Sequence, residues 1–204
     1  MRVTMVPGNA WKDESSPATE RAELDGWKGY LSISTTVWVA WAMYVEPGLR
    51  SEAAWCILNQ IYQYGGDTNA HVLRSDGKLY WVGKATNDPP GWPVRYSQPL
   101  KRGVWLQFVE TYKFDPVGGN GHWKSWLDGR QVVNFKGPLG SKRAKAVYPK
   151  FGIYRATSQP YDGVEDRRAT DRLSVRYANM RFGRQNLSHL IKKPEPLPAW
   201  ETWP

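Results

Sequence analysis

Short runs of alternating apolar and polar residues dominate this sequence, and clusters of Gly, Pro, Asn and Asp separate them. In the run 104–109, Val, Leu and Phe alternate with Trp, Gln and Val. Successive side chains of a strand point to opposite faces of a sheet, so such a run predicts a strand with one buried face. Other β-prone runs lie at 30–45, 55–64, 150–155 and 173–182. Many short strands without a long helix predict an all-β sandwich or barrel.

Two Asp-Gly pairs predict tight hairpins between neighbouring strands. Asp76-Gly77 separates the runs 70–74 and 78–82, and Asp128-Gly129 separates the runs 122–127 and 131–135. Segments rich in Pro, Gly and Ser at 6–20 and 86–93 are predicted to be loops.

The chain of 204 residues suits one domain, which we place at residues 1–185. A Pro-rich extension, 186–204, follows and contains Trp200 and Trp203. Its prolines exclude regular structure, so we expect it to pack as an extended strap or to dock on a neighbouring subunit of an assembly. The single cysteine, Cys56, lies in an apolar run and is predicted to be a core residue without a disulfide.

Charge and hydropathy limit the classes of partner. A net charge of +9 favours polyanions, but no zinc-finger, helix-turn-helix or aromatic RNA-binding motif is present, so we expect no specific nucleic acid. No apolar stretch reaches membrane-spanning length, so no membrane insertion is expected. The segment 1–9 lacks the apolar core of a signal peptide, which predicts a protein that is cytoplasmic, packaged in a virion or exported by a non-classical route.

Aromatic residues are unusually frequent, with twelve Trp and eleven Tyr. Each offers a flat apolar face and a polar edge, which suits stacking against a sugar ring and hydrogen bonding to its hydroxyls. Together with the positive charge, this composition favours an acidic polysaccharide as the ligand. A tryptophan-rich core is the alternative explanation for any single Trp.

Three short segments stand together as a motif: Glu20-Arg21-Ala22-Glu23-Leu24, Asn59-Gln60-Ile61-Tyr62-Gln63, and the segment 148–155, which has the sequence Tyr-Pro-Lys-Phe-Gly-Ile-Tyr-Arg. In this order they resemble the polysaccharide lyases with a concanavalin A-like fold, the alginate, glucuronan and heparinase-I-like lyases. The likeness spans about residues 18–183. It implies a β-jelly-roll sandwich of two antiparallel sheets with a concave groove. We expect no cofactor and no metal ligands.

The resemblance also implies a reaction, β-elimination at a uronic acid. The sugar carboxylate must be neutralised, a base must remove the C5 proton, and an acid must protonate the leaving O4. An arginine and an amide serve the first task through charge-assisted hydrogen bonds. A tyrosine can be base, acid or both where nearby cations lower its pKa from about 10.

By the same resemblance, Arg21, Gln60, Lys150 and Tyr154 match residues of the lyase motifs. Arg21 and Gln60 would then hold the uronate carboxylate, Tyr154 would be base and acid, and Lys150 and Tyr62 would support it. Tyr62 departs from the family pattern, which often has histidine there. Gly152, between Lys150 and Tyr154, would leave room for a sugar ring.

Other interpretations of single residues stay open. Arg21 and Glu23 could form an ordinary ion pair, and Lys150 could only orient its strand. As further substrate-binding residues we consider His71, Arg155, Trp81 and Trp126.

The predicted function is therefore binding, and cleavage by β-elimination, of an acidic polysaccharide. The alternative is a non-catalytic glycan-binding or structural protein of a phage particle, a tail or head component on a lyase-like fold. Tyr62 in place of histidine and the Pro-rich extension favour the alternative.

Overall fold

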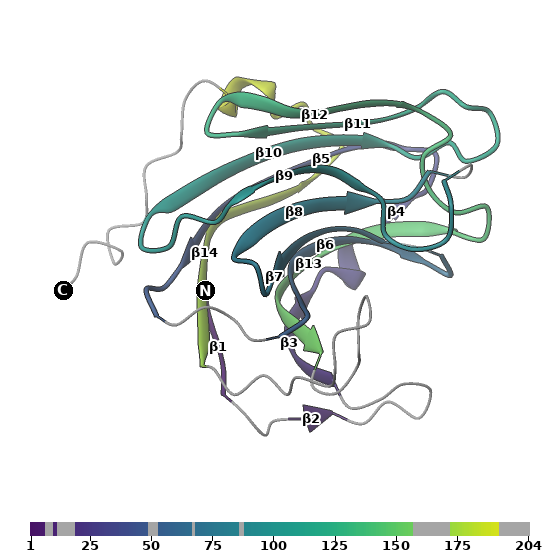
Figure 1. Ribbon diagram of the computed structural model, residues 1–204. Coiled ribbons are helices and arrows are strands. Elements are labelled where there is room, and N and C mark those ends of the chain that lie inside the picture. Colours follow the sequence, from purple (N-terminus) through teal and green to yellow (C-terminus); the bar gives the residue numbers. More distant parts are fainter. Residues whose placement is uncertain are drawn as a thin grey trace.

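Two antiparallel β-sheets pack face to face in the computed structural model of the protein (Figure 1). The structure describes residues 1–6, 10–11, 19–48, 53–66, 68–85, 88–156 and 172–191. The predicted all-β jelly-roll sandwich is confirmed. Trp200 and Trp203 of the Pro-rich extension lie outside the described residues.

The six-stranded sheet has the order β1 (Arg2–Met5), β14 (Leu173–Gly183), β5 (Thr36–Val45), β10 (Trp105–Lys113), β11 (Gly121–Leu127) and β12 (Arg130–Gly137). The eight-stranded sheet has the order β2 (Ala10–Trp11), β3 (Thr19–Asp25), β13 (Ala146–Ala156), β6 (Trp55–Tyr64), β7 (Thr68–Arg74), β8 (Lys78–Gly83) and β9 (Val94–Pro99), and β4 (Leu31–Ser32) also pairs with β13. Two short 3-10 helices complete the described elements, η1 (Trp27–Gly29) and η2 (Ser188–Leu190). In the described part of the chain, no helix is long and apolar enough to cross a membrane.

Aromatic side chains fill the space between the sheets. Trp41 of β5 stacks on Phe108 of β10 with ring centroids 4.7 Å apart, and Trp81 and Trp123 are fully buried in the same cluster. Part of the tryptophan content therefore serves the core. Cys56 is buried there as a core residue, as predicted.

The segment that follows β14 covers part of the other face of the six-stranded sheet. Leu187 and Leu190 pack on Ala40 and Val109 there. Residues beyond 185, where we placed the domain boundary, thus contribute to the packing of the fold.

Strand β6 contains a β-bulge that decides which of its side chains face outward. Ile57 pairs with Val72 of β7, but Asn59 pairs with His71, so β6 has one extra residue between these pairs. As a result Leu58 and Asn59 both point into the core. Beyond the bulge the alternation is inverted, and Gln60 lies on the outer face of the sheet.

Strand β13 has a matching irregularity between Phe151 and Tyr154. The hydroxyl of Tyr177, from the opposite sheet, lies 2.5 Å from the carbonyl oxygen of Leu58 and 2.8 Å from that of Gly152. One buried tyrosine therefore serves backbone carbonyls in both irregular segments, and it ties the two sheets together beneath them.

Gly152 allows β3 to approach β13 closely. A Cβ atom at this position would lie 2.1 Å from the carbonyl oxygen of Ala22 and 2.6 Å from Cα of Glu23. Glycine is needed here for backbone packing, whereas the sequence suggested that it makes room for a sugar ring.

We predict that Gly152→Ala lowers the free energy of unfolding by about 1–3 kcal/mol, because β3 must move away from β13. Urea denaturation followed by tryptophan fluorescence measures the change. Gly183→Ala is a matched control, since a Cβ atom at that position would have no other atom within 4 Å. Equal stability of the two variants would contradict the prediction.

Candidate active site

Three adjacent strands bring the five predicted catalytic residues together on the outer face of the eight-stranded sheet. Tyr154 of β13 lies opposite Arg21 of β3. Lys150, four residues earlier on β13, lies opposite Gln60 of β6. Tyr62 lies two residues beyond Gln60, on the same face.

Arg21 lies directly against the predicted acid–base residue. Its guanidinium carbon is 3.9 Å from the ring centroid of Tyr154, and its Nε is 3.5 Å from Oε2 of Glu23. The ion pair considered from the sequence is therefore present alongside the contact with Tyr154. A guanidinium over an aromatic ring is a favourable cation–π arrangement, so this contact holds Arg21 against Tyr154.

Gln60 is held in a fixed orientation by hydrogen bonds at both ends of its amide. Its Nε2 donates to Oε1 of Glu23 over 2.7 Å, and its Oε1 accepts from the Thr68 hydroxyl over 3.1 Å. Glu23 thus joins Arg21 and Gln60 into one cluster, in which a carboxylate already lies between an amide donor and a guanidinium.

Burial raises the pKa of Glu23 above its ordinary value of 4.5, although the hydrogen bond from Gln60 and the charges of Lys150 and Arg21 lower it. A raised pKa in the folded state means that the protonated carboxyl favours folding. The stabilisation is complete below the pKa of the unfolded chain, and it is lost as the pH rises through the folded pKa.

We therefore predict that Glu23→Gln raises the melting temperature at pH 8 by roughly a few degrees and leaves it nearly unchanged at about pH 4. The glutamine keeps an acceptor for Gln60 and removes the buried charge. Thermal unfolding of both proteins across this pH range measures the difference. If the melting temperature of Glu23→Gln fell relative to that of wild type as the pH rises, the charge of Glu23 would instead stabilise the fold.

Lys150 lies among two tyrosines and an aspartate. Its Nζ is 4.4 Å from the ring centroid of Tyr62 and 5.7 Å from that of Tyr148. Oδ2 of Asp25 is 3.9 Å away. Burial, and then the negative charge of Asp25, raise the pKa of Tyr148 to about 12. The raised pKa disfavours the phenolate form of Tyr148, so Tyr148 is a poor candidate for the base.

The four further substrate-binding residues expected from the sequence do not lie on this surface. His71, Trp81 and Arg155 are buried in the interior of the protein. His71 and Trp81 point into the core because each is one residue out of phase with the outward-facing side chains of its strand. Arg155 is paired with buried Glu20. Trp126 stacks on Trp38, 6.3 Å away, on the outer side of the six-stranded sheet.

His71 instead belongs to a buried polar network beneath the site. Its Nε2 is 3.1 Å from Oε1 of Glu110 on β10, and its Nδ1 is 3.1 Å from Oδ1 of Asn59. The Asn59 amide in turn donates to the carbonyl oxygen of Lys150 over 2.9 Å. A continuous chain of hydrogen bonds therefore links the six-stranded sheet to the backbone that carries Lys150.

Aromatic residues that were not predicted as ligand contacts do lie on the outer face. Trp55 is 5.0 Å from Tyr154 in an edge-to-face arrangement, and Trp92 and Tyr80 belong to the same cluster. Trp55 could have been found from its spacing, since it lies two residues before outward-facing Ile57. Within the described residues, no group of three or more His, Cys, Asp or Glu side chains could hold a metal ion.

Comparison with known proteins agrees with this arrangement. Residues 1–168 match the family model described as polysaccharide lyase. The chain belongs to the polysaccharide lyase family. The matched segment includes the three short sequence motifs, and with them the whole cluster around Arg21, Gln60 and Tyr154.

Solved structures of lyases share the fold of this polysaccharide lyase family member. An endo-β-1,4-glucuronan lyase from the fungus Trichoderma reesei superposes with a TM-score of 0.60 and 14% identity, covering 90% of this chain and 79% of that one. An alginate lyase from polysaccharide lyase family 7 superposes with a TM-score of 0.59 and 14% identity, covering 89% and 76%. No curated protein sequence gives a significant match.

Proposed function

We propose that the protein cleaves a uronate-containing polysaccharide by β-elimination at the site formed by Arg21, Gln60 and Tyr154. The contact between the Arg21 guanidinium and the Tyr154 ring, with the oriented Gln60 amide two strands from Arg21, carries the proposal. The similar solved structures are named as lyases of glucuronan and alginate, both polyuronates. The net charge of +9 suits the same class of polymer.

Each step of the elimination has a candidate residue. Arg21 and Gln60 would bind the uronate carboxylate, so that negative charge developing on the sugar is stabilised. The Tyr154 phenolate would take the C5 proton, the C4–O4 bond would break, and a C4–C5 double bond would form. The Tyr154 phenol would then give that proton to the departing O4, which restores the phenolate.

Lys150 and Tyr62 would support this chemistry from the neighbouring positions. Nζ of Lys150 lies 4.4 Å from the ring centroid of Tyr62, and Lys150 is paired with Gln60 across the strands. Tyr62 stands where the related lyases often have histidine, so the proton transfers would fall to Tyr154 alone. Both the removal of the C5 proton and the protonation of O4 in the proposed mechanism therefore require Tyr154.

The unsaturated sugar that β-elimination produces absorbs ultraviolet light, so the test is absorbance during incubation with polyuronates. Alginate, glucuronan and a heparin-type polymer are the substrates, and a neutral glucan is the control. We expect a rise with at least one polyuronate and none with the glucan. No rise with any polyuronate, combined with measurable binding to one of them, would favour the non-catalytic glycan-binding alternative.

A further inference from the structure

An aromatic surface continues the candidate site across β6, β7 and β8. We call Trp55, Tyr80 and Trp92 the aromatic platform. It covers four small apolar residues of the outer face that are themselves buried: Ile57, Ala70, Val72 and Val82. The platform residues are only partly buried, unlike Trp41 or Trp123 in the core.

The platform adjoins Tyr154 on the β6 side of β13, whereas Arg21 adjoins it on the β3 side. Trp55 is 5.0 Å from Tyr154, and Trp92 is 6.1 Å from Trp55. Across the sheet, Tyr154 pairs with Ile57, Ile57 with Val72 and Val72 with Tyr80. Three strand spacings of about 4.8 Å therefore separate Tyr154 from Tyr80. A polymer bound at Tyr154 and running across the strands would lie over this surface.

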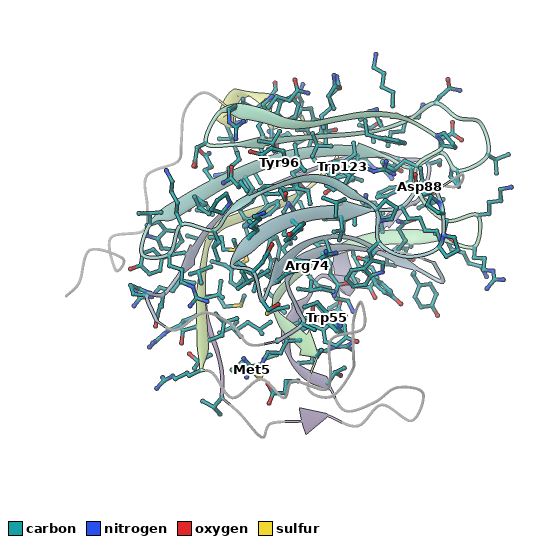
Figure 2. The ribbon with its side chains drawn as sticks, in the orientation of Figure 1. Met5, Trp55, Arg74, Asp88, Tyr96 and Trp123 are labelled. Carbon is teal, nitrogen blue, oxygen red and sulfur yellow. The ribbon has the colours of Figure 1, made fainter. Side chains whose placement is uncertain are left out.

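An arginine lies beside the platform, between Trp55 and Tyr80. Arg74 is directly opposite Trp55 in the pairing of β7 with β6, and Figure 2 labels both residues. The Arg74 guanidinium carbon is 4.4 Å from the ring centroid of Tyr80. The Tyr80 hydroxyl donates to Oδ2 of Asp76 over 2.5 Å, which holds the ring in place beneath the arginine.

We propose that the aromatic platform and Arg74 form a subsite for a uronate residue that flanks the one being cleaved. The apolar face of the sugar would stack on Trp55 and Trp92, and its carboxylate would bind Arg74. The inference rests on the proposed function, because it takes the same acidic polymer as the ligand. It assigns to this chain an extended binding surface and a preference for long substrates.

Two variants test the subsite without touching Arg21, Gln60 or Tyr154. Trp92→Ala removes one platform ring, and Arg74→Gln removes the cation. We expect each to reduce kcat/KM on the long polyuronate about five- to tenfold, mainly through KM, and to leave the shortest cleavable oligosaccharide nearly unaffected. The effect of Arg74→Gln should also shrink as salt is added.

Trp105→Ala is the matched control, since Trp105 is a half-buried tryptophan beside Tyr44 on the outer face of the other sheet. If Trp92→Ala behaves like this control on the long polymer, or slows short and long substrates equally, the subsite is wrong.

Failure of the subsite and failure of the proposed function give different results. Binding to the polyuronate by affinity electrophoresis is measured beside cleavage for wild type and all three variants. Cleavage by wild type without any length-dependent loss in Trp92→Ala or Arg74→Gln overturns the subsite alone. Absence of cleavage, with binding that both variants weaken, keeps the subsite and removes the lyase activity. Absence of both overturns both proposals.

Discussion

Tyr154→Phe should abolish cleavage of the polyuronate, with a loss in kcat of about 10²–10⁴-fold. The phenylalanine keeps the ring that contacts Arg21 and Trp55 but lacks the oxygen that would take and return the proton. Binding of the polymer should change little, because the carboxylate contacts belong to Arg21 and Gln60. Initial rates of ultraviolet absorbance and affinity electrophoresis measure the two effects separately.

Tyr148→Phe is the control for this substitution. Tyr148 lies on the same strand, and its pKa of about 12 keeps it protonated at neutral pH. We expect the control to retain activity within about threefold, a change of less than 1 kcal/mol in the barrier. Similar activity of Tyr154→Phe and wild type would remove Tyr154 as the acid–base residue, and the mechanism proposed here with it.

Glu110→Ala should destabilise the fold by about 3–5 kcal/mol, because Glu110 is the fully buried centre of the network between the sheets. Its Oε1 contacts His71, and its Oε2 accepts a hydrogen bond from the Tyr112 hydroxyl. The alanine would leave both partners buried without that acceptor and create a cavity. Chemical denaturation at constant pH measures the change in the free energy of unfolding.

Glu110→Gln separates the loss of hydrogen bonds from the loss of charge. The glutamine retains an oxygen for Tyr112 and a polar group for His71, so we expect it to recover at least half of the stability lost in Glu110→Ala. A Glu110→Ala protein within about 1 kcal/mol of wild type would show that the network contributes little to stability.

The fold could be predicted because its signals are local. The alternation in 104–109 reappears as Leu106 and Phe108 in the core with Trp105 on the outer side, and the Asp-Gly turns join β7 to β8 and β11 to β12. In the described part of the chain, strands β1, β2 and β9 were missed, and β2 lies in the segment 6–20 that was predicted to be a loop. β9 has no fully buried residue to make its pattern visible, and β1 has only four residues. The predicted strand 30–45 is divided by a turn into β4 and β5.

Only part of the site could be predicted, because a sequence motif identifies residues but does not show to which face of the sheet each side chain points. Arg21, Gln60, Lys150 and Tyr154 came from the lyase motifs, and the structure brings them together. His71 was expected at the ligand because histidine is chemically versatile, but the pairing of β7 places it in the core. Trp81 and Trp126 were chosen by residue type alone. The aromatic residues that lie on the same outer face as the site are Trp55, Trp92 and Tyr80.

The composition of this surface depends on the bulge at Leu58 as well as on the residues of β6. If β6 kept all its residues but lost the bulge, strict alternation from Ile57 would turn Gln60 and Tyr62 inward, while Asn59 and Ile61 would face the solvent. Evolutionary change by substitution can alter the chemistry of the surface one residue at a time. Loss of the bulge at constant strand length would instead exchange the two faces of β6 beyond Leu58 at once, so the site depends on a feature of the backbone that no single side chain supplies.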